Sequence, residues 1–90
     1  MTPVVDDGKI PPSRLQYRLR IAREEARLDR PALAAATGLS VKSVSNAERG
    51  AHRPRRRVII AWAAATGVPI NWLENGIGAW EPPSEESAHS

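Results

Sequence analysis

Apolar side chains recur along the chain at the spacing of a helix rather than that of a strand. In the first such stretch the intervals are four, three and four residues, at Leu15, Leu19, Ala22 and Ala26. These positions share one face of a helix. Ser13 stands before them in a position to cap that helix. The pattern therefore predicts a first helix from Ser13 to about Arg27.

Two short helices separated by a tight turn are predicted next. Asp29 can cap a helix from about Arg30 to Thr37, because its carboxylate can accept from the unpaired amides of a first turn. Gly38 then supplies a left-handed stop, and Ser40 can cap a third helix from about Val41 to Arg49. The inward positions of that third helix are expected at Val41, Val44 and Ala47.

The remaining apolar residues predict two further helices. A fourth helix follows Pro54 and is stopped by Gly67. Its expected inward positions are Val58, Ile59, Trp62, Ala63 and Thr66. A short fifth helix covers about Pro69 to Asn75. No strand pattern is recognisable, so the expected fold class is all-α with five short helices.

Polar, proline-containing segments flank the helical region. Residues 1–12 carry three prolines and no helical period, and residues 81–90 are polar and interrupted by proline. Ninety residues suit one core rather than two. We therefore expect a flexible arm at 1–12, one helical domain at 13–76, and a C-terminal tail at 77–90 that is largely disordered after 81.

Composition removes several classes of function. The chain has no cysteine and two histidines, His52 and His89, so neither a disulfide nor a cysteine-based zinc site is available. His52 has no partner at metal spacing, and no catalytic constellation is discernible. We expect no enzyme activity, no metal, no cofactor and no small-molecule ligand. No apolar run approaches the roughly 20 residues of a membrane span, which favours the cytoplasm.

Charge is distributed unevenly along the chain. Residues 13–57 carry twelve Arg or Lys against four acids, a net charge of +8, whereas the rest of the chain sums to −5. A basic centre attracts polyanions, and nucleic acid is the commonest polyanion in a cytoplasm. The charge therefore favours a nucleic-acid partner, although a solvated charged surface would give the same count.

The segment at 28–50, LDRPALAAATGLSVKSVSNAERG, combines these features. Small Ala34 lets two helices approach at a steep angle, Gly38 permits the tight turn, and Leu39 fills the gap between them, which predicts a helix-turn-helix pair. The order and spacing of these residues resemble the lambda-repressor-like family of Cro, phage repressors and xenobiotic-response-element regulators. The resemblance covers about residues 14–74, and the pair Trp62 and Trp72 is similar to that of small regulators from phages of actinobacteria.

This resemblance implies a regulator that binds double-stranded DNA with its third helix in the major groove. The side chains implied to reach base edges are Val41, Lys42, Ser43 and Asn46. The residues implied to contact phosphates are Arg30, Ser40, Arg49, Arg53, Arg55 and Arg56. Arg23 and Glu48 resemble the internal ion pair of the family. Arg27 departs from the family, because it stands where Gly or Asn is frequent.

Two functional hypotheses remain open. The first is a Cro-like protein or minimal phage repressor, because the length leaves no room for the separate C-terminal domain of larger phage repressors. The second is a protein-interaction module, such as an antitoxin or anti-repressor, on the same fold. RNA binding is disfavoured, because an aromatic platform for stacking bases is missing. Four large apolar residues either cover the edge of the core or form a weak homodimer favoured on DNA: Ile60, Trp72, Ile77 and Trp80.

Overall fold

The computed structural model describes residues 13–77. Within that range it contains five helices and no strand: α1 (Leu15–Glu25), α2 (Arg30–Thr37), α3 (Val41–Arg49), α4 (Arg56–Thr66) and α5 (Ile70–Asn75). The predicted all-α fold class is confirmed. The arm predicted at 1–12, and the tail predicted at 77–90 apart from Ile77, lie outside the described residues.

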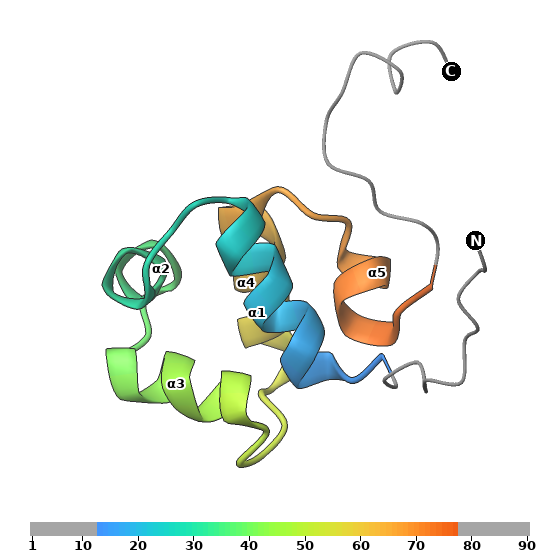
Figure 1. The fold of residues 1–90 in the computed structure, drawn as a ribbon, viewed down its shortest axis with the longest axis horizontal. Coiled ribbons are helices and arrows are strands. Elements are labelled where there is room, and N and C mark those ends of the chain that lie inside the picture. Colours follow the sequence, from blue (N-terminus) through green and yellow to red (C-terminus); the bar gives the residue numbers. More distant parts are fainter. Residues whose placement is uncertain (1–12, 78–90) are drawn as a thin grey trace, which may run out of the picture.

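Helices α1 and α4 form the centre of the domain. Figure 1 shows α2 and α3 on one side of this central pair and α5 on the other. Helix α1 packs against α3, α4 and α5, while α2 packs against α3 and α4. This arrangement leaves α3 along the margin of the molecule, with one face on the core and the other turned outward (Figure 1).

Trp62 is the largest fully buried side chain of the core. Its indole Nε1 donates a hydrogen bond to the Leu19 carbonyl oxygen at 3.0 Å, so α4 is joined to the backbone of α1. Ile59 and Ala63 are buried beside it, whereas Val58 and Thr66, also predicted to face inward, are half-buried. The other buried apolar residues of the described chain are Leu19, Ala22, Leu33, Ala34, Val44, Ala47, Val68 and Leu73.

The ends of α2 and α3 agree with the sequence-based boundaries because their caps are local. The Asp29 carboxylate accepts from the Ala32 amide at 2.8 Å, and the Ser40 hydroxyl accepts from the Ser43 amide at 3.0 Å. Gly38, with φ of 79°, reverses the chain after α2. Such contacts span only three or four residues, so the sequence pattern displays them directly.

Helix α1 is shorter than predicted at both ends. Ser13 does not cap it, because the Ser13 hydroxyl and carbonyl oxygens accept from the Arg18 guanidinium instead, and Arg14 occupies the cap position. At the other end the helix closes at Ala26, and Arg27 adopts a left-handed conformation with φ of 61°. The predicted end near Arg27 was therefore wrong by two residues.

Helix α5 is fastened by a buried side chain of α1. The Arg18 Nε donates to the Leu73 carbonyl at 2.9 Å, and its Nη2 donates to the Glu74 carbonyl at 3.0 Å. Burial, and to a smaller extent the charge of Arg53, lowers the pKa of the Arg18 guanidinium. Because Arg18 also holds Ser13, the two ends of the described chain lie together beside α5 (Figure 1).

The large apolar residues without an obvious inward position fall into two groups. Trp72 is half-buried and packs against the core. Ile60 and Ile77 are 45% and 63% exposed. Trp80 lies outside the described residues. Trp72 therefore helps to cover the core, and a contact with a partner stays a prediction for all four residues.

Candidate nucleic-acid interface

The helical period of α3 places its buried and its exposed residues on opposite faces of the helix. Val44, Ala47 and Glu48 are buried against the domain. Lys42 and Ser43 are exposed, and Asn46 is half-buried. Val41, the first residue of α3, was also expected among the inward positions, but it is 43% exposed. The structure thus leaves all four residues predicted to reach base edges accessible on α3.

Two hydrogen bonds organise these side chains. The Ser40 hydroxyl donates to the Ser43 hydroxyl oxygen at 3.0 Å while it accepts from the Ser43 amide. At the other end of α3 the Arg49 guanidinium donates to the Asn46 carbonyl oxygen Oδ1. The amide orientation of Asn46 is therefore held by a neighbour on the same helix.

Glu48 anchors α3 to α1 and to the start of α2. Its carboxylate accepts from Arg23 at 2.6 and 3.0 Å and from the Arg30 Nε at 3.3 Å. Arg23 also donates to the Leu28 carbonyl at 3.0 Å. The hydrogen bond from Glu48 raises the pKa of the Arg23 guanidinium more than burial lowers it. The ion pair predicted between Arg23 and Glu48 is present, and it holds α3 against α1.

The residues predicted to contact phosphates differ in their partners. Arg30 pairs with Glu48, Arg56 pairs with Glu74 at 3.2 Å, and Arg49 binds Asn46. The side chains of Arg53 and Arg55 form neither an ion pair nor a hydrogen bond within residues 13–77. Their charges are therefore the least neutralised of the set.

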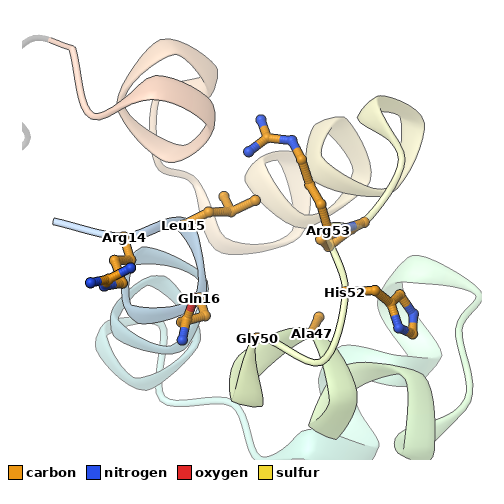
Figure 2. Close-up of a pocket in the computed structure, with 8 residues that line it drawn as sticks. Arg14, Leu15, Gln16, Ala47, Gly50, His52 and Arg53 are labelled. Atoms are coloured by element: carbon orange, nitrogen blue, oxygen red, sulfur yellow. The ribbon is translucent and has the colours of Figure 1, made fainter.

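A cavity of about 360 Å³ opens between the start of α1 and the loop from α3 to α4. Figure 2 shows Arg14 and Gln16, at the start of α1, on one side and His52 and Arg53 from the loop on the other. Gly50, with φ of 74°, forms the turn beneath Gln16. A Cβ at Gly50 would lie 2.5 Å from the Gln16 Nε2, so glycine permits this close packing as well as the turn.

A second cavity of about 340 Å³ adjoins the first along the same loop. Ser43, His52, Arg53 and Arg55 line it. The candidate site thus continues from the outer face of α3 across the loop to the first residues of α4. The described residues contain no cluster of His, Asp or Glu able to hold a metal ion. None of the described helices is long and apolar enough to cross a membrane.

The sequence analysis assigned Arg49 to phosphates rather than to the base-reading face, and it did not include Arg14 or Gln16. Arg49 lies three residues after Asn46 and seven after Lys42, so the helical period would have placed it on the same face. Arg14 and Gln16 carry no comparable signal, because they reach the loop at 50–54 only through the packing of α1 on α3.

The comparison with protein families agrees with this architecture. A family model described as a helix-turn-helix domain matches residues 15–75. Comparison with curated proteins finds no match. The matched segment includes all five helices and the α2–α3 turn on which the candidate surface is built. The chain therefore belongs to the helix-turn-helix domain family.

Proposed function

We propose that this protein is a sequence-specific regulator that binds double-stranded DNA through α3 in the major groove. The observation that carries the proposal is the outer face of α3, where Lys42 and Asn46 stand on a helix fixed at its inner side by Glu48. Side chains held on such a helix can reach base edges in a major groove. The helix-turn-helix family supports DNA binding of this kind.

Phosphate binding is assigned to the basic residues around α3. Arg53 and Arg55 are the leading candidates, since their side chains have no acidic partner within the described chain. Ser40, Arg49, Arg30 and Arg56 keep the same role as secondary candidates. Contacts of this kind position a protein on the duplex without specifying sequence.

The finer proposal is a Cro-like protein or minimal phage repressor that acts in a bacterial cytoplasm by occupying an operator. The resemblance of residues 28–50 to the lambda-repressor-like family supports it. An antitoxin or anti-repressor would instead use this fold to bind a protein. An acidic recognition helix would be repelled by a duplex and would favour a protein partner. The donor groups at Lys42 and Asn46 instead favour DNA.

Selection of bound duplexes from a random pool tests the proposal with the full chain. We expect one recovered motif, and we expect Lys42→Ala and Asn46→Ala to relax discrimination at particular base pairs by about 1 to 3 kcal/mol. Arg20→Ala, on an exposed part of α1, serves as the control and should keep the motif. Failure to recover a motif, or unchanged base preferences in both α3 variants, would exclude α3 as the reader.

We also propose a weak two-fold dimer on DNA, through the exposed apolar residues of α4 and the C-terminal segment. A dimer would place two copies of α3 about 34 Å apart and match an inverted repeat. Ile60→Ser and Ile77→Ser test this better than a change at Trp72, which packs against the core. Each should weaken binding to a full operator more than to a half-site, whereas equal losses would indicate a monomeric reader.

A further inference from the structure

The outward face of α3 contains a basic residue beyond those predicted to reach bases. Lys42, Asn46 and Arg49 follow one another at intervals of four and three residues, so they form one stripe along the helix. The opposite stripe is the buried one, at Val44, Ala47 and Glu48. Arg49 therefore lies beside Asn46 on the surface proposed to meet the base edges.

The contact between Arg49 and Asn46 restricts what the asparagine amide can recognise. An asparagine with both amide groups available pairs with adenine, since Nδ2 donates to N7 and Oδ1 accepts from N6. Here Oδ1 already accepts from the Arg49 guanidinium. An adenine amino group that approached this oxygen would also face the positive charge and the remaining N–H groups of Arg49. Adenine is thus a poor match for the pair.

Guanine fits the same pair of side chains. Its major-groove edge presents two acceptors, O6 and N7, and no donor. With Oδ1 held by the Arg49 guanidinium, Asn46 presents the two N–H groups of Nδ2, which can donate to these acceptors. The geometry therefore favours guanine over adenine at the base pair that Asn46 contacts.

The other polar groups on this face also supply hydrogen-bond donors. Lys42 has only donors. The Ser43 oxygen accepts from the Ser40 hydroxyl with one of its two lone pairs, and the Ser43 proton stays available to donate. The outward polar side chains at the N-terminal half of α3 therefore add donors to those of the Arg49–Asn46 pair.

We propose that Arg49 is a positioning residue for base recognition, which acts through Asn46 to select guanine over adenine. The inference rests on the proposed function, in which α3 occupies the major groove. It differs from the phosphate role predicted for Arg49, because a phosphate contact would strengthen binding to every sequence alike.

The experiment uses the full chain and duplexes derived from the motif that selection recovers. The base pair contacted by Asn46 is identified as the one at which Asn46→Ala removes discrimination. There the wild-type protein should prefer G·C over A·T by about tenfold. Arg49→Ala should abolish or reverse this preference, and it should have no further effect on that base pair when Asn46→Ala is already present.

Arg53→Ala is the matched control, since it removes one guanidinium from the neighbouring loop without touching Asn46. It should weaken all duplexes alike and keep the preference for G·C. Arg49→Met, which keeps the aliphatic stem but no donor, repeats the measurement if Arg49→Ala lowers the melting temperature.

The outcomes separate this inference from the function on which it rests. Recovery of no motif would overturn the proposed function itself. A motif with A·T at the Asn46 base pair, no loss of discrimination in Asn46→Ala, or a uniform loss across all duplexes in Arg49→Ala would overturn the role of Arg49 and leave DNA binding intact.

Discussion

Glu48 holds two arginines at a point where α1, α2 and α3 meet. Its side chain is 2% exposed, and its two carboxylate oxygens accept from Arg23 and Arg30. Arg23 is buried as well, whereas Arg30 is partly exposed. The two cations therefore depend on Glu48 to different degrees, because only the buried one lacks water as a substitute.

The first prediction concerns the loss of either partner of this ion pair. Glu48→Ala should lower the free energy of unfolding by about 3 to 5 kcal/mol, because it leaves the Arg23 charge buried without its carboxylate. Arg23→Ala should cost less, since Arg30 still neutralises Glu48. Urea denaturation without DNA measures both changes.

The exposed pair Arg20–Glu24 provides the control. It also joins an arginine to a glutamate, at 3.0 Å, but both side chains are at least half exposed. Loss of either partner should change the free energy of unfolding little, because water replaces the missing partner of an exposed charge. Equal losses for the buried and the exposed pair would contradict the assigned role of Glu48.

The second prediction concerns Arg27, the non-glycine residue with positive φ in the described chain. A left-handed conformation costs an ordinary residue about 1 to 2 kcal/mol, and asparagine tolerates it better. Arg27→Asn should therefore raise the free energy of unfolding by about 0.5 to 1 kcal/mol. Thermal melting measures the change. Arg27→Ala is the control, because alanine keeps the Cβ that causes the strain; stabilisation by alanine as well would point to a different cause, such as relief of charge repulsion.

At the scale of the elements, α5 depends on its neighbours. Six residues are too few for a stable isolated helix. Its support includes the packing of Ile70, Trp72 and Leu73 on the core, the ion pair from Glu74 to Arg56, and the two hydrogen bonds from Arg18 to the last turn. The contacts of Arg18 are the buried polar part of this support.

The third prediction follows from that dependence. Arg18→Met should loosen α5 while α1 to α4 stay folded, because hydrogen bonds to a charged group contribute about 1.5 to 3 kcal/mol each. Hydrogen exchange at the Leu73 and Gly76 amides should accelerate by at least about tenfold. Arg20→Met, on the same helix but exposed, should leave these amides unchanged. An equal acceleration in all five helices would instead mean that Arg18 supports the whole domain.

At the scale of the whole molecule, the arrangement of charge matters more than its sum. The net charge of the chain is +3, yet residues 13–57 alone carry +8. Within that region some arginines have acidic partners and others have none in the described chain. Adjacent residues Arg55 and Arg56 represent the two cases.

The fourth prediction compares these neighbours by the salt dependence of DNA binding. Arg55→Ala should reduce the slope of the log-log plot by about one unit, because one fewer phosphate is neutralised. Arg56→Ala should reduce it less, since Glu74 already holds that guanidinium. Titrations of one duplex at several salt concentrations give both slopes. Equal changes would show that the Arg56 guanidinium releases Glu74 when the protein binds DNA. An unchanged slope for Arg55→Ala would exclude Arg55 from the phosphate contacts.

The sequence by itself determined the features that depend on near neighbours. The caps at Asp29 and Ser40 and the stop at Gly38 act over three or four residues, so the bounds of α2 and α3 could be predicted from the pattern. The accessible residues of α3 follow from the helical period, and the same period, applied more fully, would have included Arg49 on that face.

Only the tertiary structure decided which charged groups have partners. Arg30 meets Glu48, and Arg56 meets Glu74, each across 18 positions in the sequence. Arg18 reaches the end of α5 across 55 and 56 positions and diverts Ser13 from capping α1. A side chain chooses among distant partners only after the helices have packed, so the composition shows how many charges there are, and the fold determines which of them stay available to a partner.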